Sequence, residues 1–266
     1  MVQLLLFRDE LSMSRYISPV LYILLMLVGC VAFVSIAGVR VGMFEPITGF
    51  SMLRKSVYFS LILSLLAVAS LCVCRKEKNL ASQRFFALVL IISFVYSVMW
   101  IGFYLQRTNL PNINDITTDT ETPPAFLNVN FIRSSSENSV RYDQAWASIQ
   151  EEHYPGVKPL FSSKDKDTVF ESALRLVQER EWEVVAVYSG AGIIEATART
   201  PIFGFRDDVV IRISQRNQSE IRVDMRSCSR VGSGDFGVNA ERIESFMKDL
   251  ATVLDRSSFP SLNSMR

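Results

Sequence analysis

The chain has 266 residues, of which 49% are apolar, and it carries 28 basic and 27 acidic side chains. The charges are unevenly divided: residues 1–107 hold 10 basic and 4 acidic residues (net +6), whereas residues 108–266 hold 18 and 23 (net −5), which together give the overall +1. This division excludes a single soluble domain and a disordered chain. The absence of any long Lys/Arg run excludes a polybasic nucleic-acid binder.

The basic first part contains three charge-free apolar segments, residues 16–39, 57–74 and 85–106, of 18 to 24 residues each. A helix needs about 20 apolar residues to cross the hydrocarbon core of a bilayer. The first segment is long for a cleaved signal peptide, and buried soluble helices would need a large soluble partner to cover them. We therefore predict three transmembrane helices within residues 1–107, embedded in a lipid bilayer.

Basic residues flanking the spans indicate the orientation, because Lys and Arg are retained on the cytoplasmic side. The N-terminus and the second loop share one side and carry six basic residues: Arg8, Arg15, Arg75, Lys76, Lys78 and Arg84. The other side carries four: Arg40, Arg54, Lys55 and Arg107. After Arg107 the next basic residue is Arg133. This bias places the N-terminus in the cytoplasm and the C-terminal part outside it.

The polar second part divides into a linker and a domain. Residues 108–125 are rich in Pro, Asn, Asp and Thr and lack periodicity, which predicts an extended linker. Residues 126–260 are long enough for one compact domain.

The domain offers few residues for metal or nucleophilic chemistry. His153 is the only histidine of the chain, and Cys228 is the only cysteine of the polar part. A single cysteine cannot form a disulfide within the polar part, and one histidine with one cysteine cannot complete a zinc site. No nucleophile motif lies near His153. We expect no metal, no cofactor and no catalytic residue set.

The first elements of the domain are a helix and two strands. Thr168 and Glu171 match a capping box, in which Thr168 begins an amphipathic helix that continues to about Glu181. Residues 183–188 and 193–200 then have the pattern of two strands joined by a glycine-containing turn.

A second hairpin follows. Its apolar residues alternate with polar ones and share one face: Val209, Ile211, Ile213, Ile221, Val223 and Met225. A three-residue loop at 217–219 keeps both sets on the core face, because a one-residue slip would turn every side chain over. That register sets Arg212 opposite Asp224. It also sets Asp208 opposite Cys228, so the outer face becomes a ladder of alternating charge.

A last helix completes the domain. Asn239 can cap a helix from about Ala240 to Arg256, whose apolar side chains recur on one face. The order of helix, four strands and helix predicts an α+β extramembrane domain, with a four-stranded antiparallel sheet and two helices packed on one face.

These residues resemble the domain of unknown function 1499 (DUF 1499) family over about residues 112–255. The matching pieces are residues 114–119, 123–126, 154–155, 203–208 and 226–239, followed by Arg242 and Ile243. The resemblance implies a membrane-anchored bacterial form, in the inner membrane with its domain facing the periplasm. It implies no activity.

A dense polar cluster is the candidate site. Its residues are proposed ligand-binding groups: Asp208, Arg226, Arg230, Ser233, Asp235 and Asn239. An anion could bind at the arginines and at the unpaired N–H groups of the last helix. Alternatively, Arg226 and Arg230 pair with Asp208 and Asp235, and the cluster only braces the fold. Cys228 would be a redox thiol only if a neighbouring Arg lowered its pKa and left it exposed.

Three classes of function follow. The sequence favours a non-enzymatic envelope module whose domain binds a protein, a lipid headgroup or a small anion. The alternatives are a hydrolase that uses Asp235 with the arginines, and a subunit of a membrane complex that docks on a membrane or envelope protein.

Overall fold

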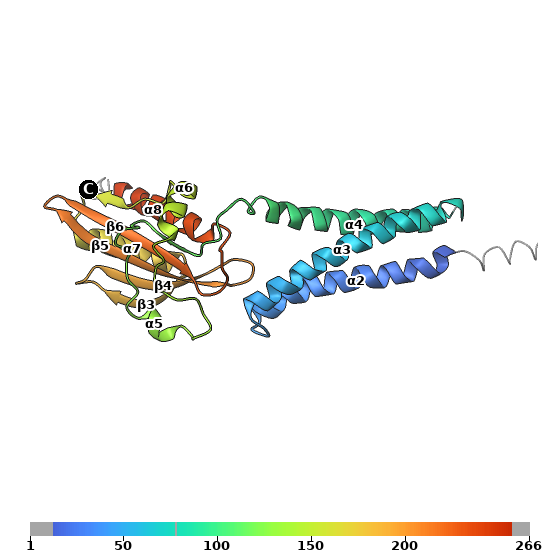
Figure 1. Cartoon of the computed structure of the whole chain (residues 1–266), viewed down its shortest axis with the longest axis horizontal. Helices are drawn as coiled ribbons and strands as arrows, with labels where there is room; N and C mark the ends of the chain where they lie inside the picture. Colours follow the sequence, from blue (N-terminus) through green and yellow to red (C-terminus); the bar gives the residue numbers. More distant parts are fainter. Residues whose placement is uncertain (1–12, 78, 257–266) are drawn as a thin grey trace, which may run out of the picture. The chain divides into compact units, whose positions relative to one another are not determined.

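The computed structural model describes residues 13–77 and 79–256 of the chain (Figure 1). The chain forms two compact units, Met1–Gln106 and Arg107–Arg266. Arg8 and Lys78, which entered the charge argument, lie outside the described residues, as do residues 257–260 of the expected domain.

Three long helices make up the first unit. They are α2 (Met13–Arg40), α3 (Pro46–Cys74) and α4 (Leu80–Leu105), and a short 3-10 helix, η1 (Arg75–Glu77), follows α3. All three are long and apolar enough to cross a membrane. The three predicted apolar helices are therefore confirmed, with α3 beginning well before residue 57.

A row of serines joins α3 to α4. The Ser60 hydroxyl donates to the Ser93 carbonyl at 2.9 Å, the Ser64 and Ser93 hydroxyls lie 2.8 Å apart, and the Ser97 hydroxyl donates to the Val57 carbonyl at 3.5 Å. Small side chains let two helices approach closely in lipid, and their hydroxyls form interhelical hydrogen bonds there. The serine row therefore holds this pair of helices together.

The second unit is an antiparallel α+β domain (Figure 1). In chain order its elements are β1 (Asp115–Thr117), α5 (Val129–Ile132), α6 (Trp146–His153), β2 (Leu160–Ser162), α7 (Lys166–Glu179), β3 (Glu183–Tyr188), β4 (Ile193–Arg199), β5 (Arg206–Asn217), β6 (Glu220–Ser229) and α8 (Val238–Arg256). The strand order is β1-β6-β5-β4-β3, and β2 also pairs with β6. The sheet has six strands, so the prediction of four was wrong: β1 and β2 have three residues each, too few to show an alternating pattern.

The first strand pairs with a strand far along the chain. Asp115 lies opposite Cys228 and Thr117 opposite Arg226, and Ile116 between them is fully buried. β1 thus falls inside residues 108–125, which were expected to form an extended linker.

Helices α7 and α8 pack on one face of the sheet, as predicted. Their apolar side chains, among them Val169, Val177, Phe246 and Leu250, share a core with Ile211. The start of α7 differs from the prediction. Asp165 is its N-cap and accepts a hydrogen bond from the Thr168 amide at 2.8 Å, so Thr168 lies inside the helix. The Asp165 carboxylate also accepts from the Thr168 hydroxyl, which explains why Thr168 looked like a cap.

The predicted register of the second hairpin is confirmed. Arg212 lies opposite Asp224, and Asp208 lies opposite Cys228. The closing turn differs slightly, because Asn217 pairs with Glu220 after an irregularity in β5. The expected three-residue loop is therefore a two-residue turn with a β-bulge that restores the register.

Much of the second face of the sheet, which was expected to be an outer ladder of charge, is also buried. Residues 119–142, here named the cover segment, lie across it. Phe126 and Val129 of this segment form a small apolar cluster with Val210 and Cys228. The charged side chains between them are therefore removed from water: Asp208 and Asp224 are 0% exposed and Arg226 is 3% exposed.

Candidate functional site

Under the cover segment, Arg226 of β6 forms a buried ion pair with Asp115. Its Nε and Nη2 donate to the two carboxylate oxygens of Asp115 at 2.8 and 2.6 Å. Nη1 donates to the Pro124 carbonyl at 3.1 Å, and Nη2 also donates to the Val140 carbonyl at 2.6 Å. Such bidentate, charge-assisted bonds are the strong class of hydrogen bond. Arg226 therefore fixes β1 and both ends of the cover segment.

Two aromatic rings enclose the same guanidinium. The Arg226 Cζ lies 5.0 Å from the Phe126 ring centroid and 5.5 Å from that of Tyr142. The Tyr142 hydroxyl is buried without a hydrogen-bond partner among the described residues. Burial, with the negative charge of Asp115, raises the pKa of Tyr142 to about 12. Tyr142 is therefore a neutral wall of the site and not a base.

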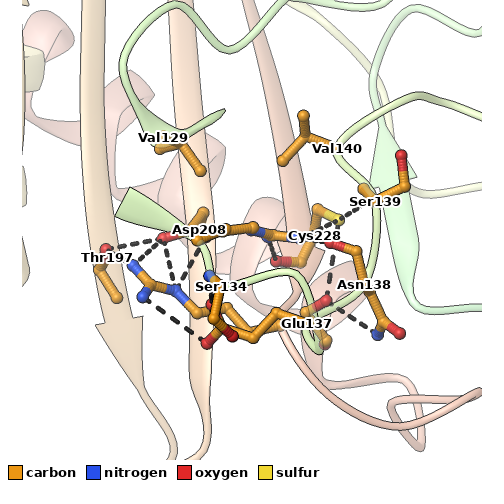
Figure 2. Close-up of polar contacts among 12 residues, drawn as sticks. Val129, Ser134, Glu137, Asn138, Ser139, Val140, Thr197, Asp208 and Cys228 are labelled. Atoms are coloured by element: carbon orange, nitrogen blue, oxygen red, sulfur yellow. Dashed lines mark hydrogen bonds and ion pairs between the residues drawn. The ribbon is translucent and has the colours of Figure 1, made fainter. Parts of the chain in front are cut away.

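Asp208 of β5 is the centre of a second network (Figure 2). Its carboxylate accepts from Arg230 Nη2 at 2.9 Å, from Arg133 Nε at 2.7 Å and from the Thr197 hydroxyl at 2.7 Å. Figure 2 shows Glu137 of the cover segment in the same group of contacts, and its carboxylate lies 3.8 Å from Arg230. Two arginines therefore share one fully buried carboxylate.

Arg133 connects this network to the cover segment, from which it projects. Its Nη1 donates to the Asn138 carbonyl at 2.7 Å and its Nη2 to the Cys228 carbonyl at 2.8 Å. Asn138 in turn donates through Nδ2 to the Ser229 carbonyl at 3.1 Å. The segment is thus pinned to β6 by side-chain donors and backbone carbonyls.

Cys228 lies between the two networks and is fully buried. Burial, and next the negative charge of Asp115, raise the pKa of its thiol to about 12, although Arg133 and Arg226 act in the opposite direction. A reactive cysteine needs a depressed pKa and exposure. The conditions set for a redox thiol are therefore not met.

A third cluster lies at the margin of the covered face. Arg212 contacts Asp119 at 2.8 Å and Asp224 at 2.9 Å, and Arg222 contacts the same two carboxylates at 3.0 and 2.9 Å. The two arginine side chains are 27% and 31% exposed. Two positive and two negative charges thus balance here.

Glu195 anchors the middle of the cover segment. Its carboxylate is 0% exposed and accepts from the backbone N–H groups of Leu127, Asn128 and Val129, at the start of α5. A carboxylate is well placed at a helix N-terminus, because the first N–H groups lack partners in the helix.

The start of α8 is already occupied by a carboxylate of the chain itself. Asp235 accepts from the amides of Gly237 and Asn239, each at 2.8 Å. Burial raises the pKa of Asp235. Within the part of the chain that the structure describes, Asp235 pairs with these amides and with no arginine, so that part of the expected bracing was wrong. The N–H groups of Gly237 and Asn239 are therefore already used by the chain itself.

Asn239 does not cap α8, which begins at Val238. Its buried amide donates to the Asn114 carbonyl at 3.0 Å and to the Ser229 hydroxyl at 2.9 Å, and its oxygen accepts from Ser227 at 2.7 Å. The Asp235 carboxylate instead bonds an amide in the first turn of α8, that of Asn239.

The six candidate residues therefore do not converge on one pocket. Asp208, Arg226 and Arg230 lie under the cover segment, whereas Asp235 and Asn239 lie at the start of α8. Ser233 lies in an exposed loop, where its hydroxyl contacts Asn112 at 3.2 Å. The residues that sequence reasoning missed are the distant partners: Asp115, Asp119, Arg133, Glu195, Arg212 and Arg222. Asp115 and Asp119 lie in the matching piece 114–119 and Arg212 was placed opposite Asp224, but no local pattern showed that these residues, or Arg133, Glu195 and Arg222, pair in the site.

The structure and the comparisons together define the class of protein. Three apolar helices precede one α+β domain, whose charged sheet face is covered by its own chain. Within residues 13–77 and 79–256, no group of three or more His, Cys, Asp or Glu could hold a metal ion. The family DUF1499, described as a protein of unknown function, matches residues 115–250, from the first residue of β1 into α8. The chain therefore belongs to the DUF1499 family. No curated protein matches it.

Proposed function

We propose that this protein is a non-enzymatic binding or scaffold module of the bacterial cell envelope. Its three helices anchor it in the inner membrane, and its domain lies in the periplasm. The observation that supports this proposal most directly is the internal pairing of Arg226, Arg230 and Asp208, each at most 5% exposed.

Charge pairing of this kind suits a brace better than a reaction centre. A catalytic acid, base or nucleophile must come within hydrogen-bond reach of the substrate. Arg226 instead bonds three groups of the chain, and Asp208 accepts from three side chains. Breaking these contacts to admit a substrate would leave buried charges unpaired, which is costly.

The alternative is a site for an anion or lipid headgroup, or a hydrolase, built on Arg226, Arg230 and Asp235. Thermal unfolding of the full chain in detergent, with phosphate or chloride at fixed ionic strength, distinguishes the two. A bound anion would stabilise the native state by mass action. We expect phosphate to give no stabilisation beyond the chloride control. A specific stabilisation that disappears in Arg226→Ala, and persists in the exposed-site variant Arg216→Ala, would overturn the proposal.

The periplasmic placement is supported by the charge bias described above. Arg107 is followed by 25 residues without Lys or Arg, so little positive charge retains this flank in the cytoplasm. A reporter that is active only in the periplasm, fused after Arg266, should give signal. Strong signal from a cytoplasm-only reporter at the same position would contradict the placement.

A further inference from the structure

Two exposed arginines lie directly opposite each other at one end of the sheet. Arg199, the last residue of β4, pairs in register with Arg206, the first residue of β5. Like charges directly opposite on neighbouring strands are destabilising. Glu183 lies 3.6 Å from Arg199, but the two side chains are 68% and 60% exposed, so this pair compensates little. The arrangement leaves an excess of positive charge facing solvent.

Exposed apolar side chains lie in the loops at this end of the sheet. The loop that joins the two arginines carries Ile202, which is 40% exposed. The next loop at this end begins beside it, because the Arg230 amide donates to the Arg206 carbonyl at 3.0 Å. That loop carries Phe236, which is 38% exposed and has a φ of 56°. A non-glycine residue in the left-handed region is strained, and such strain is often found where a side chain has a function.

The loop with Phe236 contacts the first residues of the second unit. Arg107 donates through Nη1 to the Phe236 carbonyl at 2.7 Å. A Cβ atom added to Gly237 would lie 3.0 Å from Leu110 Cδ1, so the two residues are neighbours. In the chain, Arg107 follows Leu105, the last residue of α4, by two residues.

We propose that this end of the domain docks on the surface of the bilayer and binds anionic phospholipid headgroups. Arg199 and Arg206 bind the phosphates, while Ile202 and Phe236 enter the region between headgroups and acyl chains. Arginine forms bidentate bonds to phosphate, and apolar side chains next to basic ones are typical of interfacial binding. The inference goes beyond the proposed function, and it holds for either side of the membrane.

Lipid contact can be measured on the full chain in nanodiscs. Cys30, Cys72 and Cys74 are replaced by alanine, Cys228 is kept because it is buried, and Ile202→Cys carries an environment-sensitive fluorophore. Ser189→Cys, in the turn at the opposite end of β3 and β4, is the matched position. Lipids with a nitroxide near the headgroup should quench the label at 202 strongly and the label at 189 weakly. Equal quenching at both positions would overturn the proposal.

The role of the arginines is tested in the same discs. In discs with phosphatidylglycerol, Arg206→Gln should lower the ratio of docked to undocked label at 202 roughly fivefold, which corresponds to about 1 kcal/mol for one basic residue at an anionic surface. Arg216→Gln, at the far end of β5, should leave that ratio unchanged. Two results together would overturn the assignment of headgroup binding. The label at 202 would be quenched equally in discs of phosphatidylcholine alone, and Arg206→Gln would leave that quenching unchanged. Neither result bears on the anion test of the interior site, which depends on Arg226.

Discussion

The guanidinium of Arg226 and the carboxylate of Asp115 form a bidentate ion pair that joins β6 to β1, and both residues are at most 3% exposed. The same guanidinium bonds the carbonyls of Pro124 and Val140, near the two ends of the cover segment. One side chain thus links the edge strand, the strand beside it and the layer above them.

Removing one partner of this pair should be strongly destabilising. Arg226→Ala leaves the Asp115 carboxylate buried and unpaired, so we expect the free energy of unfolding to fall by about 3 to 5 kcal/mol. The double variant Arg226→Met with Asp115→Leu should recover a large part of that loss, because neither charge of this pair is left buried without its partner. Chemical denaturation measures both. A loss below about 1 kcal/mol in the single variant would show that the pair is not a brace.

The position of β1 predicts where the domain can be separated from its helices. A fragment of residues 107–266 retains Asp115 and the Arg107 contact, so it should be soluble and unfold cooperatively without detergent. A fragment of residues 126–266 lacks β1 and leaves Arg226 without its carboxylate. It should show no cooperative thermal transition by circular dichroism. Equal transitions in the two fragments would contradict the role given to β1.

Cys228 should be inert in the native state. Its thiol is buried and its pKa is raised to about 12, mainly by burial, so almost no thiolate exists at pH 8. In a chain with Cys30, Cys72 and Cys74 replaced by alanine, iodoacetamide should not label Cys228 until guanidinium unfolds the domain. Mass spectrometry detects the adduct. Rapid labelling without denaturant would show that the cover segment opens readily.

Asp119 should contribute to acid unfolding. Burial alone would raise its pKa, but hydrogen bonds from Thr122 and Arg212 and the charge of Arg222 outweigh it, so the pKa is lowered from 3.8. A group with a depressed native pKa stabilises the fold above its unfolded pKa, and this contribution is lost as the pH falls through the native value. Stability should therefore fall below about pH 4, and Asp119→Asn should reduce that dependence while lowering stability at pH 7. A pH series of denaturation curves checks this. Identical slopes in both proteins would refute it.

Local patterns were sufficient for much of the fold. The charge-free length of the spans predicted α2, α3 and α4, and the alternation of Val209, Ile211 and Ile213 with polar neighbours predicted the register that sets Asp208 opposite Cys228. Both signals come from residues close together in the chain. They identify elements and one face of a sheet well.

The cover segment could not be inferred in this way. Residues 119–142 contain one helix of four residues, and their packing depends on contacts such as that between Arg133 and Asp208, which are 75 residues apart. A strand with apolar residues on one face and charged residues on the other predicts that the charged face is wet. Here the charged residues Asp208 and Arg226 of that face are buried, because partners from distant parts of the chain, Arg133 and Asp115, meet them.

The location of β1 also affects how the protein is made. Asp115 precedes Arg226 by 111 residues, so at about 5 to 20 residues per second the ribosome synthesises the carboxylate on the order of 5 to 20 seconds before its partner. During that interval the hairpins from β3 to β5 can form from local contacts, but the edge of the sheet has no β6 to join. A chaperone that recognises this domain before it is complete would therefore meet an unpaired β1 and an open charged face, which the finished protein conceals.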